Sequence, residues 1–366
     1  METRYLPLHH ESLHASDQNQ LPRKGTEYVK GGIQMSFVYI TEDGAYIKKR
    51  GGSFVVGQGD KDVMEIPEAV LDGLVIIDTV QVSSRAMVEF LRLGVPVTWL
   101  SRRGAFFGRL ESTRHVNVFR QEQQVLQKGG PFYMSLAKKC IAGKIHNQLT
   151  ILRRYNRYAD SSTVDEAVRQ IIANLKHIPE VQDTEELMGY EGIAARLYFH
   201  ALGELVPKDF AFTKRSKRPP LDPFNAMLSL GYTLLMYEVY TALSNEGLHP
   251  YFGFLHTLKN HHPALASDLM EEWRAVIVDS MALSLVNHHE IKIEHFEKAE
   301  DGQPGIFLTR EGRAIFLRSY EKKMRTKNQY VEGVHSYRHS LAHQIAQYAQ
   351  ALMATNVDMY EPIWLH

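Results

Sequence analysis

The strongest constraint on the fold is a change in the hydrophobic period near residue 112. Between residues 35 and 112, apolar side chains recur at every second position, as in VPVTW, which is typical of half-buried β-strands. After residue 113 they recur at helical spacing, as in VDEAVRQIIANLK, so that each segment presents one apolar stripe. These patterns predict an α+β fold, with a small N-terminal β-rich domain at 35–112 followed by a larger, mainly α-helical domain at 113–366.

Local signals divide these regions further. SFVYITEDGAYIKK predicts two strands paired through a turn at EDG, and SSRAMVEFLRLG predicts a short helix between a Ser and a Gly. IKIEHFEKAEDGQPGIFLT predicts another hairpin, and ALASDLMEEWRAVIVDSMALSLVN predicts one long helix that crosses the core. Residues 1–34 are polar and have no sustained period, which predicts a flexible extension.

Composition excludes several classes of protein. The 366 residues include one cysteine, Cys140, which rules out disulfide frameworks and multi-cysteine zinc sites and which we expect to be a small packed residue. The longest apolar run, residues 223–237, is shorter than the roughly 20 residues that a membrane span requires. Residues 1–20 contain no apolar core of a signal peptide, so we expect a cytoplasmic protein that does not contact a membrane.

Charge is balanced overall but not locally. Lys and Arg number 42, as do Asp and Glu. Residues 101–160 nevertheless carry twelve Lys or Arg against three Asp or Glu, a net of +9, and residues 206–220 carry five against one, or +4. Basic runs interleaved with Phe and Tyr fit a nucleic-acid backbone, although ordinary helix surfaces also carry many Lys and Arg side chains.

The segment FGFLHTLKNHHPALASDLMEEWR, residues 252–274, is the densest group of chemically useful side chains. Its HHP turn predicts a helix start, which Ser267 helps to cap, and the helix places Asp268 and Glu271 on one face within reach of a shared metal ion. His256 precedes this helix, after an apolar YFGFL that would anchor it nearby. The alternative is a solvated acidic first turn that the helix dipole favours, and the spacing alone leaves both interpretations open.

A second, isolated carboxylate favours a site. Glu191 lies in LMGYEGIAARLYF, an otherwise apolar helix, where the following GIAA predicts close packing and an unpaired carboxylate would be costly. Arg196 or a divalent cation would neutralise it. One Glu, one His and one or two acids from another helix form an oxygen-rich site with one nitrogen, which suits Mg²⁺ or Mn²⁺ better than structural zinc.

Three motifs occur in the order found in a known family: GYEGIAARLYF, then RPPLDPFNAMLSLGYTLL, then GFLHT followed by ALASDLMEEWRAVIVD. Together with GVPVTWLSRRGAFFG in the β-rich part, they make the chain resemble the CRISPR-associated integrase, CRISPR-associated protein one, over about residues 35–345. The resemblance implies a divalent-metal site formed by Glu191, His256 and Glu271, and it leaves open whether Asp268 or Glu271 binds the metal directly. It also implies catalytic roles for Asp268, Arg274 and Tyr232.

The resemblance further implies a set of residues that bind DNA, namely Lys259, Arg196, Asn225, Lys214, Arg215, Lys217 and Arg218. For Asn225, core packing with satisfied hydrogen bonds is an equal alternative. The implied reaction joins the 3′-hydroxyl of a short DNA fragment to a CRISPR repeat by transesterification. The implied assembly is a homodimer joined through residues 35–112, the dimerisation domain, with 113–366 as the catalytic domain. Its implied partner is a small ferredoxin-like protein, CRISPR-associated protein two.

Two other classes of function remain open at this stage. One is a metal-dependent nuclease that uses water and acts on branched DNA. The other is a non-catalytic DNA-binding scaffold whose acids only cap helices. Products joined to a target would separate strand transfer from hydrolysis, and a Glu191→Ala variant with full activity would indicate the scaffold.

Overall fold

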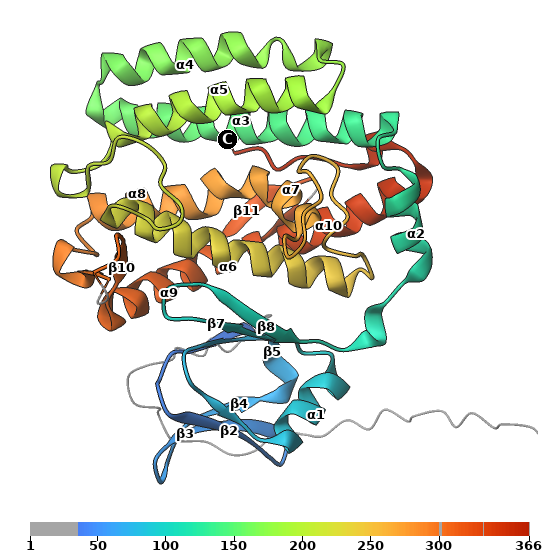
Figure 1. The fold of residues 1–366 in the computed structure, drawn as a ribbon, viewed down its shortest axis with the longest axis vertical. Coiled ribbons are helices and arrows are strands. Elements are labelled where there is room, and N and C mark those ends of the chain that lie inside the picture. Colours follow the sequence, from blue (N-terminus) through green and yellow to red (C-terminus); the bar gives the residue numbers. More distant parts are fainter. Residues whose placement is uncertain (1–35, 300–301, 332, 366) are drawn as a thin grey trace, which may run out of the picture. The chain divides into compact units, whose positions relative to one another are not determined.

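A computed structural model describes residues 36–299, 302–331 and 333–365. The flexible extension predicted for residues 1–34 lies outside this range. Within it, strands come first and helices follow, as the change of period predicts (Figure 1). The fold class is therefore confirmed as α+β, with a β-rich N-terminal region and a larger helical region.

The β-rich region contains two four-stranded sheets. In the first sheet the strand order is β1 (Ser36–Ile40), β5 (Leu71–Ile77), β7 (Val97–Leu100) and β8 (Phe106–Leu110). In the second sheet the order is β4 (Lys61–Pro67), β3 (Ser53–Gln58), β2 (Ala45–Arg50) and β6 (Gln81–Val82). Helix α1 (Ser84–Leu93) follows β6. As predicted for α1, Ser83 caps its start, and Gly94, with a φ of 74°, ends it.

The hairpin predicted between residues 36 and 49 is wrong in its pairing. The chain does turn at Gly44, where φ is +72°. However, β1 pairs in parallel with β5 of the first sheet, whereas β2 pairs with β3 and β6 of the second. Period-two alternation identifies a strand but not its partner, and β5 is buried on both faces, so it offers β1 an apolar neighbour far along the chain.

Strand β5 joins the two regions through alternate side chains. Leu74 and Ile76 belong to the core between the two sheets and α1. Val75 and Ile77, which point to the opposite face, belong to the core of the helical region. The first sheet therefore lies between two separate cores and packs against both.

The helical region is made of long helices that pack around an apolar interior. These helices are α2 (Val118–Leu126), α3 (Pro131–Ala159), α4 (Ser162–Leu175), α5 (Thr184–Gly203), α6 (Pro223–Asn245), α7 (Ala264–Trp273), α8 (Ser280–Asn287), α9 (Arg310–Arg325) and α10 (Tyr337–Ala354). Short 3₁₀ turns are η1 (Glu68–Val70), η2 (Thr113–His115), η3 (Ile178–Glu180), η4 (Lys208–Phe210), η6 (Ile293–His295) and η7 (Val357–Met359).

The single long helix predicted from residue 264 onward contains an irregularity. Its middle, η5 (Arg274–Asp279), is π-helical, so the helix is α7 and α8 joined by a wider turn. Such turns are rare and frequent at functional sites. Ser267 lies inside α7 rather than at its start, where Pro263 occupies the cap position, so the predicted cap is wrong.

Two hairpins lie between the last helices. The predicted one is confirmed in its second half, where β9 (Phe296–Lys298) pairs with β10 (Ile306–Leu308), but residues 293–295 form η6 instead of a strand. The other hairpin, β11 (Lys327–Tyr330) with β12 (Gly333–Ser336), was not predicted. In the part of the chain that the structure describes, no helix is both long and apolar enough to span a membrane.

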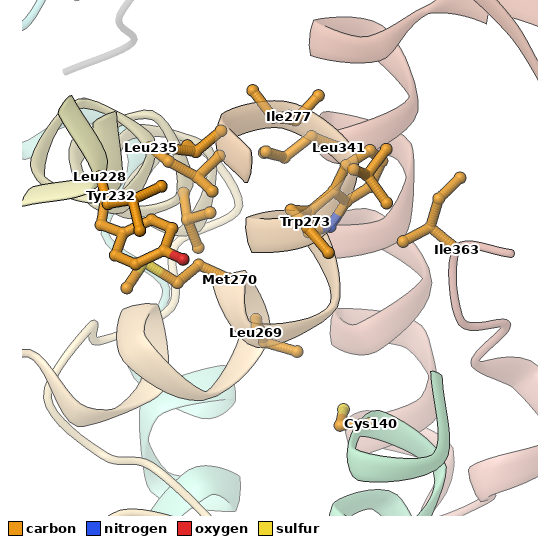
Figure 2. Packing of buried hydrophobic residues seen from close by; sticks show 14 of the residues in the cluster. Cys140, Leu228, Tyr232, Leu235, Leu269, Met270, Trp273, Ile277, Leu341 and Ile363 are labelled. Carbon is orange, nitrogen blue, oxygen red and sulfur yellow. The ribbon is translucent and has the colours of Figure 1, made fainter. Parts of the chain in front are cut away.

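Helices α7 and α10 meet in the interior around Trp273. This side chain is fully buried (Figure 2). Its Nε1 donates a hydrogen bond of 2.6 Å to Oε1 of Gln344. Leu341, on the same helix as Gln344, packs beside it. Cys140 is also fully buried, as predicted for a packed residue, and burial raises the pKa of its thiol. This packing holds α7 rigidly, and α7 carries the acids of the candidate site.

Candidate metal and phosphate site

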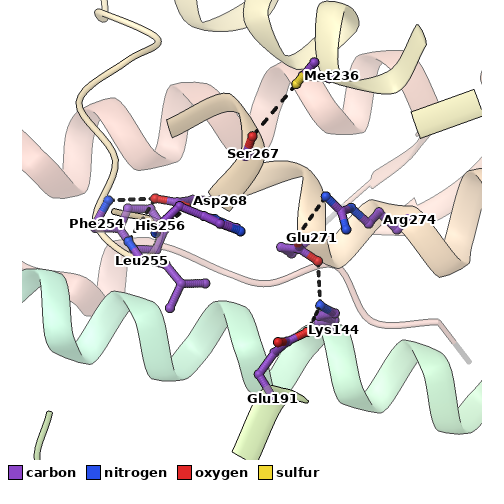
Figure 3. Close-up of polar contacts among 10 residues, drawn as sticks. All are labelled: Lys144, Glu191, Met236, Phe254, Leu255, His256, Ser267, Asp268, Glu271 and Arg274. Atoms are coloured by element: carbon purple, nitrogen blue, oxygen red, sulfur yellow. Dashed lines mark hydrogen bonds and ion pairs between the residues drawn. The ribbon is translucent and has the colours of Figure 1, made fainter. Parts of the chain in front are cut away.

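His256 and Asp268 form the first half of the candidate site. Nδ1 of His256 lies 2.5 Å from Oδ1 of Asp268, which is fully buried. The same carboxylate accepts hydrogen bonds from the backbone N–H groups of Phe254, Leu255 and His256, at 2.7, 2.9 and 3.0 Å (Figure 3). Asp268 therefore ties the loop before α7 to the helix and fixes the imidazole, with Nε2 left to bind a ligand.

Gly253 makes this close approach possible. A Cβ at this position would lie 2.5 Å from Oδ2 of Asp268 and 2.8 Å from Cβ of Ala264. Only glycine lets the loop come this near to the carboxylate. The glycine of the GFLHT motif is therefore needed for the close contact between this loop and Asp268, which positions His256.

Glu271, one turn beyond Asp268, belongs to the second half of the site. Its Oε2 lies 2.6 Å from Nζ of Lys144 on α3, and its Oε1 lies 3.0 Å from Nη2 of Arg274. The ammonium of Lys144 also contacts Oε1 of Glu191 on α5 (Figure 3). Three helices, α3, α5 and α7, therefore bring Glu191 and Glu271 to opposite sides of one cationic group.

The electrostatics follow from this arrangement. Burial raises the pKa of Glu271, but the charges of Arg274 and Lys144 outweigh it and bring that pKa down to about 2. For Lys144, burial lowers the pKa, but Glu271 and Glu191 raise it above its ordinary value. Glu271 and Lys144 are both charged at neutral pH.

Lys144 was not predicted to belong to the site, and of the two partners predicted for Glu191, Arg196 or a divalent cation, Arg196 is wrong. Glu191 pairs with Lys144 rather than with Arg196, which is exposed on the same helix. The close packing expected beside Glu191 is also wrong, because a Cβ on Gly192 would meet nothing within 4 Å. A signal for Lys144 existed in the sequence: it stands in the buried stripe of α3 between Ile141 and Gln148, a position where an unpaired lysine would be costly.

The donor set fits a hard divalent cation. Two carboxylates from Glu191 and Glu271, with an imidazole whose Nδ1 is held by Asp268, suit Mg²⁺ or Mn²⁺. Across residues 36–299, 302–331 and 333–365, however, no three His, Cys, Asp or Glu side chains lie close enough together to hold a metal ion. Lys144 lies between the two glutamates and contacts one carboxylate oxygen of each.

Tyr232 supports the candidate site by contacting Arg274, the ion-pair partner of Glu271. Its hydroxyl donates a 2.6 Å hydrogen bond to Oδ1 of Asp279, and the hydroxyl of Tyr198 donates one of 2.8 Å to Oδ2. The ring of Tyr232 carries the guanidinium groups of Arg215 and Arg274, at 5.3 and 4.9 Å from its centre. Tyr232 was predicted to be catalytic; in the structure its ring contacts two arginines and its hydroxyl donates to a buried carboxylate.

A pocket of about 610 Å³ opens beside the Glu191–Lys144 pair. Six cationic residues line it, together with Glu191, His200 and several apolar side chains; the six are Lys144, Arg196, Lys214, Arg215, Lys217 and Arg274. Four of the predicted DNA-binding residues are therefore brought to one surface. A concave surface with this density of positive charge is suited to phosphate groups.

The remaining predicted DNA-binding residues lie in different surroundings. Lys259 is exposed in the loop after His256, and Arg218 is exposed at the end of the 214–218 run. Asn225 is fully buried: its Oδ1 accepts from Nη1 of Arg215 and the backbone of Ser216, and its Nδ2 donates to the carbonyl of Lys214. Its Nδ2 also donates to Oδ2 of Asp222, so a DNA contact by Asn225 is the wrong interpretation: the side chain holds the basic loop against the start of α6.

Carboxylates and a strongly basic pocket form a surface that is suited to phosphate esters. The family model described as "CRISPR associated protein Cas1" matches residues 38–322 of this chain. The chain belongs to the Cas1 family.

Individual relatives agree with this assignment. The "CRISPR-associated endonuclease Cas1 3" of Thermus thermophilus is 36% identical over 304 residues, which cover 82% of this chain and 88% of the relative. A chain of a "Cas6-RT-Cas1--Cas2 complex" is 26% identical with a TM-score of 0.79, covering 92% of this chain; this chain spans only 37% of that longer one. A Cas1 protein from Thermotoga maritima, 22% identical, has the same fold with a TM-score of 0.76 over 90% of this chain and 99% of the other.

Proposed function

We propose that this protein is a divalent-metal-dependent DNA endonuclease and integrase that uses Mg²⁺ or Mn²⁺. Its substrates would be short DNA fragments, whose 3′-hydroxyl ends it joins to a CRISPR repeat during spacer acquisition. Family membership supports the enzyme class, since the relatives are named endonucleases. The observation that carries the proposal is that Glu191 and Glu271 both contact Lys144, which lines a pocket with six cationic residues.

The chemistry is an exchange of phosphodiesters. The 3′-hydroxyl of the fragment loses its proton as its oxygen attacks the phosphorus at the repeat boundary. The bond from that phosphorus to the original 3′ oxygen breaks, and the leaving oxygen takes up a proton. One phosphodiester forms as another is lost, so no nucleotide cofactor is required. When bound by Glu191, His256 and Glu271, the metal would polarise the scissile phosphate and stabilise its developing charge.

The residues of the chain supply position and charge. Asp268 orients His256, and the ion pair with Arg274 fixes the direction of Glu271. Tyr232 holds the guanidinium groups of Arg215 and Arg274 at the pocket, where they would bind phosphate oxygens in a fixed geometry. Because the displacement needs aligned reactants more than a strong acid or base, this positioning is the main contribution of the protein.

The proposed assembly is a homodimer joined through the β-rich domain, residues 35–112, so that two sites act at the two ends of a repeat. The proposed partners are DNA and the small CRISPR-associated protein two. Support for that protein partner comes from the similar chain that lies in a complex named for both Cas1 and Cas2. The basic segment 101–160 and the loop at 214–218 would hold the DNA.

A strand-joining assay tests the proposal. A labelled fragment with a 3′-hydroxyl is incubated with a repeat-containing duplex, Mn²⁺ and the protein partner, and the products are separated on a denaturing gel. We expect joined products that disappear in Glu191→Ala and His256→Ala variants that remain folded. Shortened strands without joined ones would indicate a hydrolytic nuclease instead, and full joining by Glu191→Ala would indicate that these acids play no catalytic part.

A further inference from the structure

Lys144 occupies the centre of the candidate site. It comes from α3, its side chain is almost wholly buried, and its ammonium contacts Oε1 of Glu191 and Oε2 of Glu271. A cation that bridged the two glutamates would contact these same oxygens. The ammonium and the divalent ion cannot share that position, because their volumes overlap and their like charges repel at such short range.

The pocket gives Lys144 another place to go. Lys144 itself lines the cavity of about 610 Å³, and so do Arg196, Lys214 and Lys217. Its four-carbon stem is flexible, so rotation about its side-chain bonds would carry the ammonium from the glutamates into the cavity. There it would join a group of cationic side chains that lacks a matching number of acids and is suited to phosphate.

We propose that Lys144 exchanges partners during the reaction cycle. It neutralises Glu191 and Glu271 until a divalent cation takes its place, and it then turns into the pocket and binds a phosphate of the DNA. This inference rests on the proposed function, and it makes Lys144 a residue that both competes with the metal and contacts the substrate. Its consequence is that metal binding prepares the site for DNA.

A purely structural role for Lys144 predicts a change of the opposite sign in metal affinity. If Lys144 only holds the two glutamates together, its removal lets the carboxylates repel each other and weakens metal binding. If it competes with the metal, its removal strengthens metal binding. The sign of the change in Mn²⁺ affinity therefore separates the two roles.

The first measurement is a Mn²⁺ titration of the full chain without DNA, by calorimetry or by the electron paramagnetic resonance of free Mn²⁺. We expect Lys144→Met to bind Mn²⁺ about tenfold more tightly than the wild type, as removal of one competing charge requires. Lys138→Met is the matched control, since it removes the same charge from the same helix, where Lys138 donates only to the carbonyl of Pro179. Unchanged or weaker binding by Lys144→Met would overturn the proposal.

A second measurement uses the wild-type chain and does not depend on a variant folding. Lysine side chains are acylated with an amine-reactive reagent, with and without Mn²⁺, and the modified peptides are quantified by mass spectrometry. Labelling of Lys144 should rise when Mn²⁺ is present, because the amine leaves its buried ion pairs, whereas Lys138 should not change. Equal labelling of Lys144 in both conditions would contradict the exchange.

The proposed contact between Lys144 and a DNA phosphate is tested by measuring how DNA affinity depends on salt concentration. With a metal that supports binding, Lys144→Met should lower the slope of log Kd against log salt concentration by about one, and without metal it should leave the slope unchanged. An equal effect in both conditions, or none in either, would rule out the phosphate contact. If the wild type binds no Mn²⁺, or if the Glu191→Ala variant binds Mn²⁺ as tightly as the wild type, the proposed metal site fails. If binding requires Glu191 but Lys144→Met does not tighten it, only the exchange fails.

Discussion

Oδ1 of Asp268 lies 2.5 Å from Nδ1 of His256, and the whole carboxylate is committed to this ring and to three backbone N–H groups. A carboxylate used so completely orients the imidazole and has no oxygen left for a metal. Glu271, whose oxygens face only exchangeable ion-pair partners, is the acid of α7 that the geometry offers as a ligand. The structure thus distinguishes two acids that their spacing in the sequence could not.

An Asp268→Asn substitution tests this division of roles. The amide keeps the size of the side chain but loses the charge that orients His256, and it turns an N–H group toward backbone donors. We expect Mn²⁺ affinity to fall about 10- to 100-fold, as is typical for partners that orient a metal-binding histidine. Ser267→Ala is the control, because that hydroxyl contacts only the sulfur of Met236, at 3.8 Å. Unchanged affinity in Asp268→Asn would show that Asp268 does not position the ligand.

Gly253→Ala tests the approach of the loop. The added methyl group would lie 2.5 Å from Oδ2 of Asp268. We expect a loss of about 1–3 kcal/mol in the free energy of unfolding, measured with urea, and weaker Mn²⁺ binding because His256 shifts with the loop. Gly189→Ala on α5 should leave stability unchanged or raise it, since its Cβ meets nothing within 4 Å and alanine favours a helix.

A Tyr232→Phe substitution tests whether the hydroxyl of Tyr232 takes part in the reaction or whether the ring only supports the two arginines. The ring that carries Arg215 and Arg274 is retained, while Asp279 loses the donor at 2.6 Å. We expect thermal unfolding at a lower temperature, with a loss of about 1–3 kcal/mol, and strand joining close to the wild-type rate. A large loss of joining at unchanged stability would show instead that the hydroxyl takes part in the reaction.

Asp279 makes stability depend on pH. Burial raises the pKa of its carboxyl to about 6, despite hydrogen bonds from Tyr232 and Tyr198 that lower it. Because the folded-state pKa lies above the unfolded value of 3.8, the contribution of this group is complete below about pH 4 and is lost as pH rises through about 6. We expect this one group to remove roughly 3 kcal/mol over that interval.

The measurement compares urea unfolding at pH 4 and pH 7. Asp279→Asn should lose less stability over this interval than the wild type, since the amide does not titrate. Asp160→Asn, which removes a carboxyl from the exposed end of α3, should follow the wild type. If Asp279→Asn has the same pH dependence as the wild type, Asp279 is not the group responsible.

Arg338 of α10 forms a buried ion pair with Glu238 of α6. Nη2 of Arg338 lies 2.7 Å from Oε1 of Glu238, and burial raises the pKa of this glutamate against the effect of the arginine. Arg338→Met would leave a buried carboxylate without its partner, at a cost of about 3–5 kcal/mol. A double variant with Glu238→Leu should regain most of this loss in chemical denaturation. A single variant as stable as the wild type would show that the pair is dispensable.

Much of the fold follows from the sequence because hydrophobic period and caps are local properties. The order of strands and helices, and the ends of α1, depend on residues within a few positions of one another. The pairing of β1 with β5 does not, since partners about 35 residues apart are chosen by the burial of both faces of β5. The hairpin of β11 and β12 was missed because its strands are only four residues long and largely polar.

The sequence motifs predicted which residues belong to the candidate site, but they did not predict which contacts those residues make. The motifs named Glu191, His256 and Glu271, yet no spacing indicates that Lys144 of α3 reaches both glutamates across 47 and 127 residues. The assignment of Asn225 to DNA failed for the same reason. Polar residues in a functional motif either face the ligand or hold the loop that does, and only the contacts made by their side chains distinguish these cases.

The π-helical turn at Arg274–Asp279 has a consequence for reading relatives of this chain. It contains one residue more than an α-helical turn, so losing a single residue there would rotate everything downstream by about 100°. Asp279 would then turn away from both tyrosines. Insertions and deletions are usually tolerated in surface loops, but here a one-residue gap within a buried helix would mark proteins whose tyrosine–aspartate network is built differently.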